Sequence, residues 1–142
     1  MIAEKISGFV GITRLDKPIG IYLLLWPALI ALLVSTEASI NYSFVIIVIA
    51  GSILVRSTGC VINDIFDMKF DKKVERTKDR PLASGQLSKR EAYYIFLVLS
   101  VFSLLFVSIL ERQTQLVCLF FAVCIVSYPL TKRFLKIPQI FL

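Results

Sequence analysis

Four long stretches of the chain contain no charged residue, and each approaches the roughly 20 apolar residues that cross a bilayer as a helix. The second stretch resumes beyond Arg56, so its helix is expected to extend into the charged segment that follows. The pattern therefore predicts membrane-spanning helices over residues 18–36, 42–71, 90–110 and 113–131, with a polar loop over residues 72–89.

The composition supports a membrane protein. Hydrophobic residues make up 57% of the 142 positions and the mean hydropathy is +0.80, far above the values of soluble domains. The expected fold is all-α, a polytopic transmembrane bundle that forms one domain over residues 1–142.

The absence of histidine removes the commonest general acid or base and any zinc site built on imidazole. The three cysteines lie in apolar segments, which favours buried thiols over a disulfide framework: Cys60, Cys118 and Cys124.

The basic residues indicate the orientation in the membrane. Apart from Arg56, fourteen Lys and Arg lie in alternate connections and termini, against one on the other side. By the positive-inside rule, both termini and the polar loop are expected in the cytoplasm. The first 17 residues contain no apolar run of signal-peptide form, so a bacterial inner membrane is the expected location and the lipid bilayer the expected surrounding. No nucleic-acid partner is expected.

The end of the second predicted helix carries an acidic face. At about 100° per residue, Asp64, Asp67 and Asp71 fall within an arc of about 60°, and Asn63 and Arg56 lie on the same side. Carboxylates stacked in this way repel one another, so a compensating cation is expected. Oxygen ligands without histidine or thiolate select hard cations such as Mg²⁺.

A simpler explanation stays open for this face. Lys69, Lys72 and Lys73 could neutralise an ordinary solvated helix end. Arg56 favours the functional interpretation because it lies about 12 Å deeper than Asp64, and a charge inside the membrane marks a functional site by default. Its side chain could instead extend along the helix toward the cytoplasmic surface.

Other basic residues are expected at the same level of the membrane. Singly, each is explained by the positive-inside rule. Together they could hold a metal-complexed polyanion at the surface, and the head of a lipid diphosphate fits, with its tail among the apolar helices. These residues are Arg14, Lys17, Arg76, Lys78, Arg80, Lys132 and Arg133.

The spacing of these residues resembles a known motif. Asn63-Asp64-x-x-Asp67-x-x-x-Asp71, followed by Arg76-Thr-x-x-Arg80-Pro-Leu-x-x-Gly85, is similar to the first aspartate-rich motif of the UbiA-type intramembrane aromatic prenyltransferases. Two further segments resemble the 4-hydroxybenzoate branch of that family: Leu-Leu-Leu-Trp26-Pro27 and Tyr128-Pro-Leu-Thr-Lys132-Arg133. The resemblance extends from Arg14 to the last residue.

The resemblance implies an activity and roles for particular residues. The implied reaction transfers a polyprenyl group from polyprenyl diphosphate to the ring of 4-hydroxybenzoate, with Mg²⁺, in ubiquinone biosynthesis. The implied ligands of the Mg²⁺-diphosphate are Asn63, Asp64, Asp67 and Asp71. Arg133 joins the three aspartates as an implied catalytic residue, while Lys132 contacts the diphosphate and Arg14 and Arg56 line the substrate pocket.

One departure from the family is large. Members of the UbiA-type family are expected to have about nine helices and a second aspartate-rich motif. This chain carries four complete predicted helices. We therefore expect it to be the N-terminal half of such a bundle and to be inactive alone. Two alternatives stay open: a family member with another aromatic acceptor, and a non-enzymatic four-helix transporter or assembly subunit. A phosphatidyl-group transferase is disfavoured, because the Asp-Gly-x-x-Ala-Arg segment of those enzymes is absent.

Overall fold

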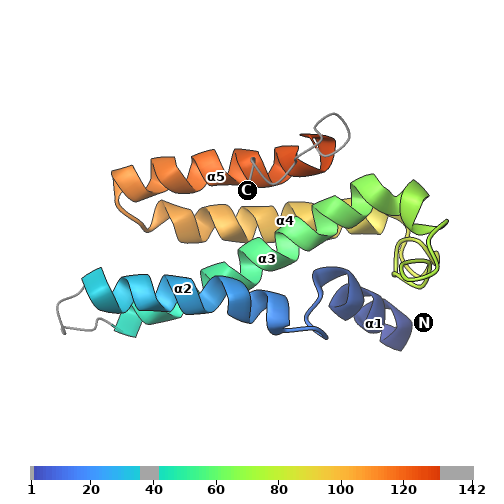
Figure 1. Cartoon of the computed structure of the whole chain (residues 1–142), viewed down its shortest axis with the longest axis horizontal. Helices are drawn as coiled ribbons and strands as arrows, with labels where there is room; N and C mark the ends of the chain where they lie inside the picture. Colours follow the sequence, from blue (N-terminus) through green and yellow to red (C-terminus); the bar gives the residue numbers. More distant parts are fainter. Residues whose placement is uncertain (1, 36–41, 132–142) are drawn as a thin grey trace.

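The computed structural model describes residues 2–35 and 42–131, and these residues form five helices and no strand. The predicted all-α class is confirmed, with one more helix than expected. Figure 1 shows the long helices running along the molecule and the short one beside the N-terminus. Their bounds are α1 (Ile2–Thr13), α2 (Ile19–Ser35), α3 (Tyr42–Asp71), α4 (Lys89–Ser108) and α5 (Arg112–Thr131).

Helix α3 organises the bundle, because it packs against each of the other four helices. Within the described ranges, α3 and α4 are long and apolar enough to cross a membrane, and α2 is a shorter apolar helix of 17 residues. Only 11% of the apolar window of α4 is buried inside the protein. Large side chains such as Leu23, Leu97 and Phe120 are more than half exposed. Apolar surface of this extent is typical of a protein that contacts lipid or further helices.

The sequence pattern did not predict helix α1. Two glycines within 12 residues disfavour a helix on propensity alone, so contacts with the rest of the protein must stabilise it. The glycines create those contacts: a Cβ at Gly8 would lie 2.9 Å from Leu87 Cγ, and one at Gly11 would lie 2.8 Å from Pro81 Cγ. Helix α1 therefore packs closely on the loop that joins α3 to α4.

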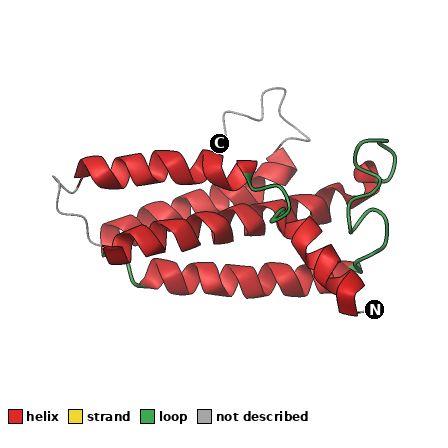
Figure 2. Cartoon of the chain, turned by 90° about the horizontal axis from the view of Figure 1, so that it is seen from below, coloured by secondary structure: helices red, strands yellow, loops and turns green. Residues whose placement is uncertain are grey.

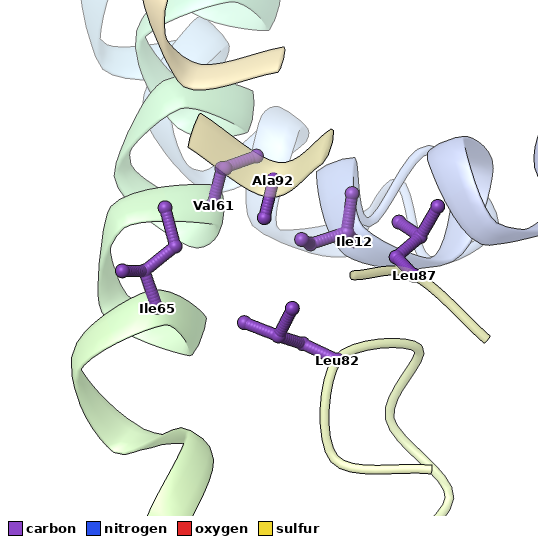
Figure 3. Close-up of a cluster of buried hydrophobic side chains, with 6 residues drawn as sticks. All are labelled: Ile12, Val61, Ile65, Leu82, Leu87 and Ala92. Carbon is purple, nitrogen blue, oxygen red and sulfur yellow. The ribbon is translucent and has the colours of Figure 1, made fainter. Parts of the chain in front are cut away.

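That loop, residues 72–88, is folded back rather than extended from the bundle. Figure 2 shows it at the same end of the molecule as the N-terminus. Leu82 and Leu87 are 2% and 3% exposed, which shows that the loop contributes to the core. Figure 3 shows how it closes a cluster with α1, α3 and α4, whose members are Ile12, Val61, Ile65, Leu82, Leu87 and Ala92. This cluster fixes the position of α1 relative to the end of α3.

Polar contacts define where α4 begins. Ser88 caps the helix, accepting a hydrogen bond from Glu91 N at 3.3 Å, while the Glu91 side chain accepts one from Ser88 N at 2.8 Å. This reciprocal pair satisfies amide groups that have no partner within the helix. Glu91 also forms a 2.7 Å ion pair with Lys5 of α1, so the same residue joins α4 to the N-terminal helix.

Candidate functional site at the end of helix α3

The last two turns of α3 bring the acidic residues to the end of the bundle where α1 and the loop pack. Asp64 and Asp71 lie seven residues apart on one face and are 2% and 8% exposed. Asn63 and Asp67 are half-buried on the same part of the helix. Buried carboxylates require strong polar partners, because desolvation disfavours the charged form. Those partners come from elsewhere in the chain.

Arg14 is the first partner of Asp64. Its Nη2 donates to both carboxylate oxygens of Asp64, at 3.1 and 2.9 Å, and its Nη1 donates to the carbonyl oxygen of Gly11 at 3.1 Å. The side chain of Asp64 is 3% exposed and that of Arg14 is 18% exposed, so water screens this ion pair only weakly. The turn between α1 and α2 is thereby tied to Asp64, the first aspartate of the acidic face.

The backbone of Arg14 is unusual. Its φ angle is 60°, in the left-handed region where glycine is normally found. Leu15 N bonds the oxygen of Val10 at 3.1 Å and Arg14 N bonds that of Gly11 at 3.4 Å, which is the pattern of a Schellman motif ending α1. Compared with glycine, an arginine in this position costs about 1 kcal/mol of backbone strain. The contacts of the Arg14 side chain therefore explain why an arginine lies there.

Arg80 is the second partner and joins the two aspartates. Its Nη1 donates to Asp64 Oδ1 at 3.1 Å and to Asp71 Oδ2 at 2.9 Å. The loop holds this arginine: Ser84 N bonds the carbonyl oxygen of Arg80 at 2.8 Å, and Thr77 Oγ1 bonds that of Asp71 at 3.1 Å. Two carboxylates and two guanidinium groups thus form one charge-balanced network, which we call the four-residue network: Arg14, Asp64, Asp71 and Arg80.

A cavity of about 510 Å³ opens beside the four-residue network, between α1, the α1–α2 turn and the loop. Arg14 and Arg80 line it as well as binding the aspartates. Four basic and two acidic side chains contribute to the walls: Arg14, Lys17, Arg76 and Arg80, with Asp16 and Asp79. The cavity offers room for an anionic group at the arginines.

The expected magnesium ligands do not form a metal site in this arrangement. Their oxygen-only chemistry suits Mg²⁺, but Asp64 and Asp71 are bound by arginines. Across residues 2–35 and 42–131, no group of three or more His, Cys, Asp or Glu is placed to hold a metal ion. The lysines that offered the simpler explanation, Lys69, Lys72 and Lys73, are exposed, and the ion pairs of Asp64 and Asp71 come from arginines instead.

Arg56 lies apart from the four-residue network. Arg56 is exposed and its guanidinium lies against the backbone of Gly20 on α2, two helical turns away from Asp64 along α3. Lys132 and Arg133 fall outside the described residues. The structure therefore brings together Arg14, Asp64 and Asp71 of the predicted set, with Asn63 and Asp67 on the same helix end.

Two features of this region were not predicted from the sequence. Arg80 was named among the basic residues and within the motif but was given no role of its own, although the Arg80-Pro-Leu segment could have singled it out. Ser57 lies seven residues before Asp64 on the same face and is 2% exposed, and its hydroxyl has no hydrogen-bond partner among the described residues. The heptad spacing of Ser57, Asp64 and Asp71 was visible in the sequence.

Comparison with known proteins gives a consistent result. The model of the UbiA prenyltransferase family matches residues 24–142. A relative from Dechloromonas aromatica (strain RCB), named 4-hydroxybenzoate octaprenyltransferase, is 48% identical, over 99% of this chain and 48% of its own length. Relatives with the same name from Methylobacillus flagellatus and Coxiella burnetii (strain CbuK_Q154) are 43% and 39% identical, each over 99% of this chain and 48% and 49% of their own lengths.

No solved structure matches this chain. The chain spans about half the length of the curated relatives that it matches. The family model covers most of the sequence, including the acidic end of α3, the loop and helices α4 and α5. With an aspartate-rich helix end inside an apolar helical bundle, the chain belongs to the UbiA prenyltransferase family.

Proposed function

We propose that residues 1–142 form the N-terminal part of a single membrane-embedded prenyltransferase domain. The whole domain transfers a polyprenyl group from polyprenyl diphosphate to the ring of 4-hydroxybenzoate, in ubiquinone biosynthesis. Family membership and the names of the relatives support this assignment. The observation that carries it is the convergence of Asp64, Asp71, Arg14 and Arg80 at one end of an apolar bundle. Polyprenyl diphosphate has a charged head and a long apolar tail, so its binding needs charged residues at one end of an apolar bundle.

The chemistry assigns distinct tasks to these residues. Negative charge develops on the diphosphate as it leaves, and preorganised cations stabilise that charge. Among the residues that the structure describes, Arg14 and Arg80 are the candidates for these cations. We assign Lys132 and Arg133 to the same task. The allylic cation left behind then forms a bond to a carbon of the electron-rich ring, and that ring carbon loses its proton to restore the aromatic ring. Running this reaction between helices excludes water, which would otherwise capture the cation.

Mg²⁺ is part of the proposal, with Asn63, Asp64, Asp67 and Asp71 as its proposed ligands. Bound there, it would neutralise charge on the diphosphate. The structure described above holds Asp64 and Asp71 on arginines, so these ligands would have to take up a different arrangement. Arg56 is proposed to meet the carboxylate of the aromatic acceptor, because a guanidinium can bind a carboxylate through two parallel hydrogen bonds.

We further propose the location and the limits of the chain. The site faces the cytoplasm of a bacterial cell with the protein in the inner membrane, since the basic residues gather on that side. The 142 residues alone are proposed to be inactive. Their acidic residues occupy one face of one helix, whereas a diphosphate with its metal presents oxygens on several sides.

The proposal is tested in the full-length protein that contains these residues. Membranes carrying it should form prenylated 4-hydroxybenzoate from polyprenyl diphosphate in the presence of Mg²⁺. Asp67→Asn should reduce the rate at least a hundredfold while the protein stays inserted, and Lys78→Gln, which changes an exposed ion pair with Glu75, should keep the rate within about twofold. Product from another aromatic acid but not from 4-hydroxybenzoate would reassign the acceptor. Full activity of Asp67→Asn would remove the aspartates from the reaction.

A further inference from the structure

Arginines satisfy three of the four carboxylate oxygens of Asp64 and Asp71. Arg14 Nη2 bonds both oxygens of Asp64, and Arg80 Nη1 bonds one oxygen of each aspartate. The side chains of the two aspartates are only 3% and 11% exposed, so their charges are compensated almost entirely by these two guanidinium groups. A metal ion that approached the same oxygens would compete with bonds already made.

We propose that Arg14 and Arg80 occupy the positions on Asp64 and Asp71 that a divalent cation would otherwise take. Without an anion, the arginines then prevent the cation from binding. The cation binds only together with an anion that forms ion pairs with the two arginines and so releases the carboxylates. This inference rests on the proposed function, because a prenyl diphosphate is the anion that would do so. In this role Arg14 and Arg80 set the order in which metal and diphosphate bind.

The charges in the four-residue network support this order. Two carboxylates and two guanidinium groups balance, so a divalent cation added alone would leave an excess of positive charge around buried groups. Such an excess is strongly unfavourable where water screens little. A cation that arrives with a polyanion avoids the excess, because the anion pairs with the arginines while the carboxylates pair with the metal.

The cavity beside the four-residue network is a place where an anion could replace the aspartates as partner of the two arginines. Arg14 and Arg80 line it, together with Lys17 and Arg76, so an anion in this space of about 510 Å³ meets the same guanidinium groups that bind the aspartates. To exchange one partner for the other, the side chains of both arginines would turn from the aspartates to the anion. The left-handed backbone of Arg14, at φ 60°, and its bond to Gly11 hold the base of this side chain in position during the exchange.

The experiment measures binding of Mn²⁺, in place of Mg²⁺, by electron paramagnetic resonance on the 142-residue chain in detergent micelles without diphosphate. Arg14→Gly removes the guanidinium and suits the positive φ, so the turn that ends α1 should keep its backbone conformation. Arg80→Gln removes the second guanidinium. Arg76→Gln and Lys17→Gln are matched controls, because they remove the same charge from the same cavity without an ion pair to Asp64 or Asp71 in the part of the chain described.

We expect the wild-type chain and both controls to bind Mn²⁺ weakly, and Arg14→Gly and Arg80→Gln to bind it at least tenfold more tightly. Adding Asp64→Asn to Arg14→Gly should abolish that gain. Inorganic diphosphate should then raise Mn²⁺ affinity strongly in the wild-type chain and little in Arg14→Gly. Equal affinities in the wild-type chain and the arginine variants, or an equal gain in the controls, would overturn the inference. These measurements need no prenyl transfer, so their outcome is separate from that of the activity assay.

Discussion

Gly20 of α2 lies directly against the guanidinium of Arg56 on α3. A Cβ at position 20 would be 2.6 Å from Nε and 2.7 Å from Nη2 of that arginine. The absence of a side chain at Gly20 therefore lets the guanidinium contact the backbone of the neighbouring helix. This contact fixes where along α3 the positive charge is presented, two helical turns away from Asp64.

Gly20→Ala should displace Arg56 without unfolding the protein. The clash is with the end of a flexible side chain, which can move, and alanine is a better helix former than glycine by about 1 kcal/mol. In the full-length protein we expect the KM for 4-hydroxybenzoate to rise about tenfold while the KM for polyprenyl diphosphate changes little. Gly51→Ala, in open space on α3, is the matched control and should leave both constants unchanged. Equal increases for the two substrates would contradict the assignment of Arg56 to the aromatic acid.

Gly11→Ala should weaken the packing of α1. Its Cβ would lie 2.8 Å from Cγ of Pro81, a rigid ring that cannot rotate aside, so the loop or the helix must shift. Overpacking of this kind costs about 1–3 kcal/mol. We expect a lower free energy of unfolding in mixed detergent micelles and faster tryptic cleavage at Lys78. Gly51→Ala again provides the comparison, and an undiminished stability of Gly11→Ala would show that α1 does not pack as described.

The sequence predicted the four long helices and the shared face of Asp64 and Asp71, because both depend on local periodicity. The uncharged stretches mark the long helices, and a period of 3.6 residues places Asp64 and Asp71 on one side of α3. The capping box of Ser88 and Glu91 is equally local, and the structure contains it. These features depend on residues that are close in the sequence, so the sequence alone was enough to predict them.

The partners of the aspartates could not be predicted in this way. Arg14 reaches Asp64 across fifty positions, and only because α1 ends in a left-handed turn that glycine would normally occupy. Arg80 reaches the same carboxylate because the loop folds back over α1, with Leu82 buried in the core. Helix α1 itself depends on close packing at Gly8 and Gly11. These features arise from tertiary contacts, for which a single sequence contains no periodic signal.

Asp64→Asn should destabilise the fold more than any change at an exposed ion pair. The substitution keeps the shape of the side chain but leaves Arg14 and Arg80 without their shared negative charge. Removing one partner of a buried pair typically costs 3–5 kcal/mol, and partial exposure of the two arginines reduces our expectation to about 2–3 kcal/mol. Lys78→Gln, at a surface pair, should cost less than about 1 kcal/mol. Unfolding titrations in micelles that gave the two variants equal stability would show that the four-residue network contributes nothing to the fold.

The orientation of the bundle can be tested at the two ends of α4. Lys78 lies in the loop before this helix and Glu111 in the turn after it, and both side chains are exposed. If α4 spans the membrane, single cysteines at these positions, in a variant lacking Cys60, Cys118 and Cys124, must lie on opposite sides. The excess of basic residues predicts that position 78 lies in the cytoplasm.

A membrane-impermeant thiol reagent added to intact cells should therefore label Glu111→Cys and not Lys78→Cys, and permeabilisation should make both react. Glu111 is a suitable reporter because only Arg112 contributes a basic residue to that connection, so a cysteine there leaves the charge asymmetry in place. Labelling of Lys78→Cys in intact cells would place the four-residue network on the outside, away from a substrate pool in the cytoplasm. Labelling of both positions would show that α4 does not cross the bilayer.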